Sequence, residues 1–268
     1  MFKKGKINKL NYQIAFEFRS LKWFVLEIVM FSVFLELIYM YFKTKNLEES
    51  QDIYFHTFIS GGLWEVLFYL TMVIGIVGVG KMVGGEKKGY NSMMTLRVLP
   101  LSIKDMVLSK VIVAVVSILA IYGAQLLSFM FAWSLFAESV PTAKRVSHAL
   151  NYALVKDNFI YACFPSNFLH LLVNIVVICF LVIGSTYMFY AVRTGEQNKI
   201  VVGGMFLGTQ LVAMVLLMLL KVRVPFIHFP VDTSNGSVAV VLSIIGVVYL
   251  ALNVLTCVKM YSECHYEA

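Results

Sequence analysis

The sequence predicts an all-α integral membrane protein, and the composition, the lengths of the apolar runs and the placement of the basic residues support this fold class. Of 268 residues, 60% are hydrophobic and only 14% are charged, whereas a soluble domain is about half apolar and a quarter charged. The mean hydropathy is +0.82. We therefore expect lipid to solvate much of the surface of a single transmembrane domain covering residues 1–268.

Six apolar runs are long enough to cross a bilayer, whose hydrocarbon core requires about 20 residues of helix. Each run is expected to be helical, because lipid offers no hydrogen-bond partner to an unpaired backbone group. The predicted spans are Trp23–Phe42, Gly62–Met82, Val111–Phe136, Phe168–Tyr190, Ile200–Leu220 and Val238–Val258.

The distribution of lysine and arginine predicts that both termini are cytoplasmic. With the N-terminus inside, 15 of the 22 basic residues lie in inside segments and 7 in outside segments. Cytoplasmic segments of membrane proteins carry such an excess of basic residues, which also accounts for the net charge of +7 without nucleic-acid binding. The predicted extracytoplasmic loops are residues 137–166 and 221–237.

Residues 1–22 carry an amphipathic helical pattern before the first span. Ile7, Leu10, Ile14, Phe18 and Leu21 share one narrow face, and Gln13 lies off that face. The pattern is typical of a helix lying in the inner membrane interface. The alternative is a solvated extension of the first span.

The cytoplasmic segment between spans two and three, residues 83–106, is too polar to cross the membrane. Tyr90, Met93, Met94 and Arg97 follow the i, i+3, i+4, i+7 spacing of a short helix, which Pro100 would end. Exposed tyrosine and methionine side chains on one face suit docking to another protein.

This segment resembles the corresponding part of type-2 ABC transporter permeases. Members of that family tend to have a glutamate and a glycine after the second span, an apolar helix, a Leu-Pro-Leu-Ser-like turn, and a Gly-Lys or Ser-Lys pair opening the third span. The six-span layout is also similar, although Ser109 stands where glycine is common. The matching residues are Glu86, Gly89, Met93, Met94, Leu99–Ser102 and Ser109–Lys110.

The resemblance implies the membrane-spanning subunit of a bacterial ABC exporter in the cell membrane. Two permease subunits, identical or different, would pair above two copies of a cytosolic ATPase, which binds ATP and Mg²⁺. A lipophilic or amphipathic substrate such as a peptide, antibiotic or drug would move outward. The coupling helix would be Glu86–Arg97, with ATPase-coupling residues Glu86, Gly89, Tyr90, Met93, Met94 and Arg97.

The chain itself shows no sequence signature of an enzyme, a metal site or a bound cofactor. Gly75, Gly80 and Lys81 are spaced as in a P-loop, but Met82 stands where Mg²⁺ binding requires Ser or Thr, and no strand precedes the motif. The four cysteines form no CxxC pair, and the five histidines show no HExxH pattern. ATP hydrolysis is therefore expected on a partner subunit.

Acidic and small residues within the predicted spans are the remaining candidates for function. Glu36 and Glu65 are candidate translocation-path residues, because charge in lipid is costly and usually faces protein or a water-filled cavity. The alternative for Glu36 is a contact with a polar group of a neighbouring helix, or a protonated carboxyl group. We also expect Gln125, Asn174 and Gln210 to form interhelical hydrogen bonds.

Two small-residue spacings predict close helix packing, within the subunit or in a dimer seam: Gly80-x-x-x-Gly84 and Gly204-x-x-x-Gly208. The membrane acids also leave a different class of function open, an ion- or proton-coupled secondary transporter. Transport driven by an ion gradient without ATP would distinguish that class from an ABC exporter.

Overall fold

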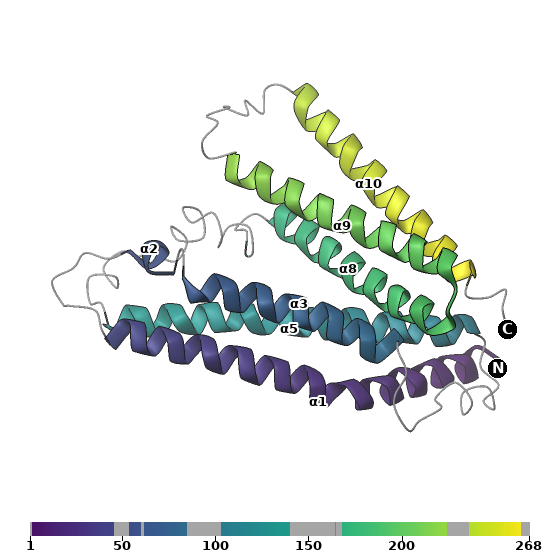
Figure 1. Ribbon diagram of the computed structural model, residues 1–268, viewed down its shortest axis with the longest axis horizontal. Helices are drawn as coiled ribbons and strands as arrows, with labels where there is room; N and C mark the ends of the chain where they lie inside the picture. Colours follow the sequence, from purple (N-terminus) through teal and green to yellow (C-terminus); the bar gives the residue numbers. More distant parts are fainter. Residues whose placement is uncertain are drawn as a thin grey trace.

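The computed structural model is a bundle of long helices (Figure 1). It describes residues 2–45, 54–59, 62–84, 103–139, 164, 168–223 and 236–263. Within these residues every regular element is helical. The elements are α1 (Phe2–Lys45), the short α2 (Phe55–Ile59), α3 (Leu63–Gly84), α5 (Ile103–Ser139), α8 (Phe168–Thr194), α9 (Gln197–Arg223) and α10 (Gly236–Glu263).

Four stretches of the described helices are long and apolar enough to cross a membrane. Many of the large apolar side chains on these helices are exposed, including Trp23 at 62% and Phe31 at 68%. Such a surface requires lipid around it, so the fold is that of a multi-pass α-helical membrane protein. The four stretches, which match the first four predicted spans, are Leu10–Lys45, Leu63–Gly84, Leu108–Ser139 and Leu171–Arg193.

The last two predicted spans fall on α9 and α10. The described side chains of α10 include the apolar stretch Val247–Met260, and Figure 1 shows α9 lying beside α8. The number of spans beyond four stays a prediction.

The predicted interfacial helix and the first span form one continuous helix, α1, of 44 residues. No proline interrupts the sequence between Phe2 and Lys45, so nothing in the backbone requires a break. Of the predicted apolar face, Leu21 is buried in the protein, whereas Phe18 is 42% exposed. Gln13 lies off that face, but it is buried at 2% exposure.

The chain directions place six helix ends together at one end of the bundle. In Figure 1 these are the start of α1, the end of α3, the start of α5, the α8–α9 turn and the end of α10. The α8–α9 turn is short because Gly195 adopts a φ of +73°, which a residue with a Cβ rarely tolerates. The start of α1 and the end of α10 therefore lie at the same end of the molecule, together with the end of α3 and the start of α5.

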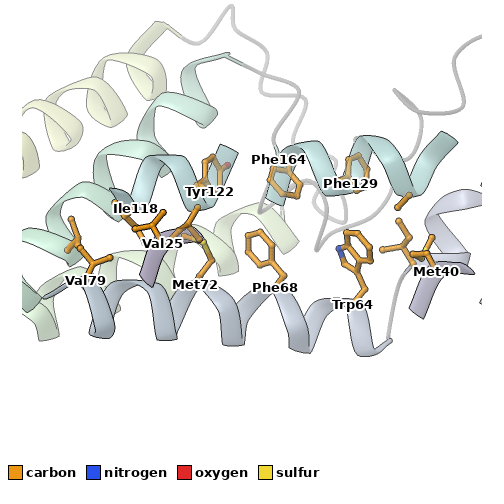
Figure 2. Packing of buried hydrophobic residues seen from close by; sticks show 14 of the residues in the cluster. Val25, Met40, Trp64, Phe68, Met72, Val79, Ile118, Tyr122, Phe129 and Phe164 are labelled. Atoms are coloured by element: carbon orange, nitrogen blue, oxygen red, sulfur yellow. The ribbon is translucent and has the colours of Figure 1, made fainter. Parts of the chain in front are cut away.

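Aromatic side chains fill the core at the opposite end (Figure 2). Phe68 and Phe129 lie 5.4 and 5.6 Å, centroid to centroid, from Phe164, and Trp64 lies near Met40. These residues come from α1, α3, α5 and the segment before α8. The cluster fixes the relative heights of these helices, because interdigitated rings leave few alternative packings.

Glycines on α3 allow the neighbouring helix α8 to approach it closely. A Cβ on Gly80 would overlap the Ser185 side chain of α8, and one on Gly84 would overlap the carbonyl oxygen of Thr186. The Gly80–Gly84 pair therefore forms a close helix contact within the subunit, which is one of the two alternatives predicted from the sequence. By contrast, no atom of the described residues lies within 4 Å of a Cβ placed on Gly204 or Gly208.

Candidate functional site

A row of polar side chains lies buried between α1 and α5, and we call it the polar seam. On α1 the row consists of two pairs, and the members of each pair are four residues apart and therefore on adjacent turns of the helix. The two helices run parallel, because successive contacts join residues 93 or 92 positions apart. The polar seam consists of Gln13, Glu17, Ser32 and Glu36 on α1 and Lys110, Ser117, Gln125 and Ser128 on α5.

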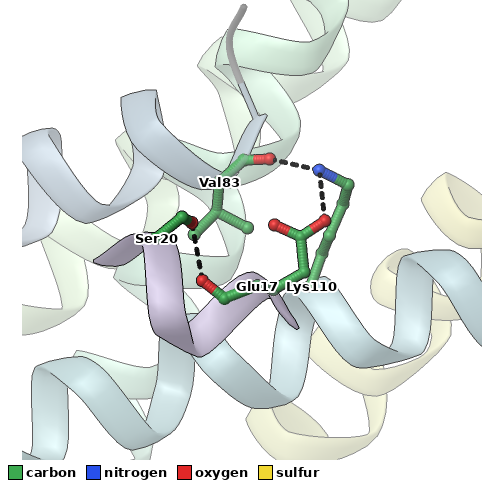
Figure 3. Close-up of polar contacts among 4 residues, drawn as sticks. All are labelled: Glu17, Ser20, Val83 and Lys110. Carbon is green, nitrogen blue, oxygen red and sulfur yellow. Dashed lines mark hydrogen bonds and ion pairs between the residues drawn. The ribbon is translucent and has the colours of Figure 1, made fainter. Parts of the chain in front are cut away.

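The section of the polar seam nearer the start of α1 is an ion pair that joins three helices (Figure 3). Lys110 Nζ of α5 lies 3.4 Å from Glu17 Oε1 of α1 and donates to the Val83 carbonyl of α3 at 2.8 Å. Glu17 is only 4% exposed. Val83 lies in the last turn of α3, where a carbonyl has no helical partner and a cation is favoured.

Gln13 lies one helical turn before Glu17 and is also buried. Among the described residues, neither its amide nitrogen nor its amide oxygen has a hydrogen-bond partner. Buried polar groups are nearly always satisfied, so the unpaired amide marks a place where further contacts can form. The hydrogen-bonding groups of Gln13 are therefore left unused beside the ion pair.

Farther from the start of α1, the polar seam joins α1 and α5 by hydrogen bonds in place of an ion pair. Gln125 Nε2 donates to Ser32 Oγ at 3.0 Å, and Ser128 Oγ donates to Glu36 Oε2 at 2.6 Å. Glu36 is fully buried and Gln125 is 1% exposed. The second oxygen of Glu36, the Gln125 side-chain oxygen and the Ser117 hydroxyl have no hydrogen-bond partner.

The structure separates the two acids that the sequence placed on a translocation path. Glu36 lies in the polar seam, where its polar contacts are with Ser128 and Gln125 of α5. Glu65 is half-buried in the first turn of α3, where a negative charge is favoured by the helix dipole. The contact of Glu36 with a neighbouring helix is the one that its alternative interpretation predicted.

The predicted interhelical hydrogen bonds of two amide side chains are confirmed. Gln125 bonds to α1, and Gln210 of α9 donates to Asn253 of α10. The Tyr249 hydroxyl donates to the Gln210 side-chain oxygen, so α10 is attached to α9 by a polar cluster. In the described chain no group of three His, Cys, Asp or Glu residues could hold a metal ion.

The sequence did not predict a role for Glu17 or Ser32, nor the ion pair between Lys110 and Glu17. A signal was present, since Gln13 and Glu17, and again Ser32 and Glu36, stand four residues apart on one helical face. The partners on α5 could not be assigned, because the register between two helices is set by packing. The predicted coupling residues lie outside the described residues, and they are Glu86, Gly89, Tyr90, Met93, Met94 and Arg97.

The fold and the polar seam together define a multi-pass α-helical membrane protein with a polar helix interface. Comparisons with protein-family models, with curated proteins and with solved structures each found no match.

Proposed function

We propose that the chain is the membrane-spanning subunit of an ABC exporter, with six spans and cytoplasmic termini, in the cell membrane of a bacterium. The proposal starts from the resemblance of residues 83–106 to type-2 permeases. Support comes from the four apolar helices and from the clustering of helix ends at one end of the bundle. With that end cytoplasmic, the basic residues Lys22, Lys81 and Lys259 face the inside, as the charge rule requires.

The observation that carries the proposal is the contact of Lys110 with α1 and α3. The chain leaves α3 at Gly84 and enters α5 at Ile103, so the predicted coupling segment begins and ends beside this contact. A displacement of the segment would therefore move the end of α3, the start of α5 and, through Glu17, the first helix. Coupling of this kind requires a packed element with two arrangements that a partner can bias.

The partners in this proposal are two copies of a cytosolic ATPase and a second permease subunit. The predicted helix Glu86–Arg97 docks on the ATPase, which supplies the ATP and Mg²⁺. ATP-driven closure of the ATPases shifts the spans and releases a lipophilic or amphipathic substrate to the outside. The substrate class follows the family resemblance and the abundance of aromatic and methionine residues.

Charged substitutions in the coupling helix test the proposal. The triple variant Tyr90→Asp, Met93→Asp and Met94→Asp should insert normally but lose at least about 90% of ATP-dependent transport, since a docking face of hot-spot residues no longer fits its groove. Transport into inverted vesicles and co-purification with a co-expressed cytosolic ATPase are the measurements. A matched control is Tyr54→Asp, because Tyr54 is 61% exposed at the opposite end. Full transport by the triple variant would contradict the proposal.

A second candidate function is an ion- or proton-coupled transporter, and the buried Glu36 favours it. An acid within a membrane-spanning helix is a common element of proton pathways. Transport that persists without ATP and collapses when the proton gradient is dissipated would select this function over the first.

A further inference from the structure

Helix α1 buries two glutamates that both contact α5, and they have different surroundings. Glu17 is 4% exposed and lies beside the ammonium group of Lys110. Glu36 is fully buried, and its polar neighbours are the neutral side chains of Ser128 and Gln125. The two residues therefore allow a comparison within one helix, between an acid that has a countercharge and an acid that has a neutral partner.

The helices packed around Glu36 bring no charged group to it. On α5 no Asp, Glu, Lys, Arg or His occurs between Lys110 and Glu138, and the titratable group there is Tyr122. On α3 the charged residues are Glu65 in the first turn and Lys81 near the end. On α1 the next cation is Lys43, two turns beyond Glu36, which donates to the backbone carbonyl of Phe58. A carboxylate at Glu36 would have no countercharge in the described chain.

Two oxygen atoms at this level of the polar seam lack a hydrogen-bond donor. They are Glu36 Oε1 and Gln125 Oε1, and both are buried. Gln125 bonds to Ser32, one turn before Glu36 on α1, and its side chain also lies within hydrogen-bonding reach of Glu36. A carboxylate can only accept hydrogen bonds, so it cannot satisfy the Gln125 oxygen, whereas a protonated carboxyl group adds an O–H donor.

We propose that Glu36 is a proton-binding site in the polar seam: it is held as a neutral carboxylic acid whose O–H donates to the side-chain oxygen of Gln125. The proton comes from water, so one carboxylate and one proton give one carboxylic acid. A single proton then removes an unpaired buried charge and satisfies both orphan oxygens. The site releases its proton when the α1–α5 contact opens to water, which would stabilise the carboxylate.

Infrared spectroscopy of the chain reconstituted in lipid nanodiscs tests this proposal directly. At about pH 8, where exposed carboxyl groups are ionised, the wild-type protein should show the carbonyl stretch of a protonated carboxylic acid. The band should disappear in Glu36→Gln and persist in Glu17→Gln, the matched substitution on the same helix. The thermal midpoint should fall by less than about 2 °C in Glu36→Gln and by about 10 °C in Glu17→Gln, which leaves Lys110 unpaired.

Absence of the band in the wild-type protein, or a band that Glu36→Gln leaves unchanged, would overturn the proposal. If Glu36→Gln does not fold, Ser128→Ala serves instead. Ser128 donates to the other oxygen of Glu36, so its removal should shift the frequency of the band. An unshifted band in Ser128→Ala would then reject the assignment. These readouts require neither ATP nor transport, so they are independent of the proposed exporter function.

Discussion

At the scale of single residues, the polar seam shows how two apolar helices accommodate buried polar side chains. Glu17 and Lys110 lie at the end of the bundle where the helix ends gather, and each supplies the charge that the other needs. Farther along, Gln125 donates a neutral hydrogen bond to Ser32. Unpaired charge is costly in a medium of low dielectric, so pairing decides which polar residues a membrane helix can bury.

Breaking the ion pair on one side should destabilise the protein. Lys110→Met leaves the Glu17 carboxylate buried without a cation and removes a donor from the Val83 carbonyl, so we expect a loss of roughly 3 kcal/mol in the free energy of unfolding. Combining it with Glu17→Gln should recover most of that loss, because neither charge then remains. Unfolding in mixed micelles gives the coupling energy, and strictly additive losses would show that the pair does not interact.

At the scale of elements, small residues decide which helices touch. On α3, Gly80 and Gly84 face α8, while a Cβ on Gly78 would overlap the ring of Phe24 on α1. Ser185 of α8 also donates to the Ile76 carbonyl of α3 at 3.2 Å, which close approach makes possible. Helix α3 is therefore packed on both sides through residues that lack bulk.

A methyl group at this interface should be poorly tolerated. Gly84→Ala would push against the backbone carbonyl of Thr186, and since backbone cannot rotate away we expect a loss of about 1–3 kcal/mol. Gly204→Ala is the matched control, because the described residues leave open space there and alanine favours helix. Thermal unfolding of both variants checks this, and equal stability of the two would contradict the packing role of Gly84.

At the scale of the whole molecule, helix directions determine which segments can share a side of the membrane. Helices α1 and α5 run parallel with α3 reversed, so the start of α1 and the two helix ends flanking residues 85–102 lie together. The α8–α9 turn lies at the same end, where Lys199 pairs with Glu196 at 2.9 Å. The helix ends that flank residues 85–102 therefore lie at the same end of the bundle as the start of α1 and the end of α10.

Single cysteines in a cysteine-free variant should reveal that side. A cysteine at Lys22 or Lys81 should resist a membrane-impermeant maleimide in intact cells and react after permeabilisation, because the excess of basic residues places that end inside. A cysteine at Tyr54, at the opposite end, should react in intact cells. Labelling of the Lys22→Cys variant before permeabilisation would reverse the orientation and remove the basis for ATPase docking at residues 85–102.

The sequence alone determined the membrane class, the helical fold and the first four spans, because apolar length and composition are local properties of the chain. It also identified Glu36, Gln125 and Gln210, since polar residues in apolar runs stand out without knowledge of their neighbours. Only the tertiary structure paired Glu17 with Lys110, joined residues 1–22 to the first span, and distinguished Gly84 from Gly208. Those outcomes depend on the register and rotation of helices against one another, which packing between residues distant in the sequence decides.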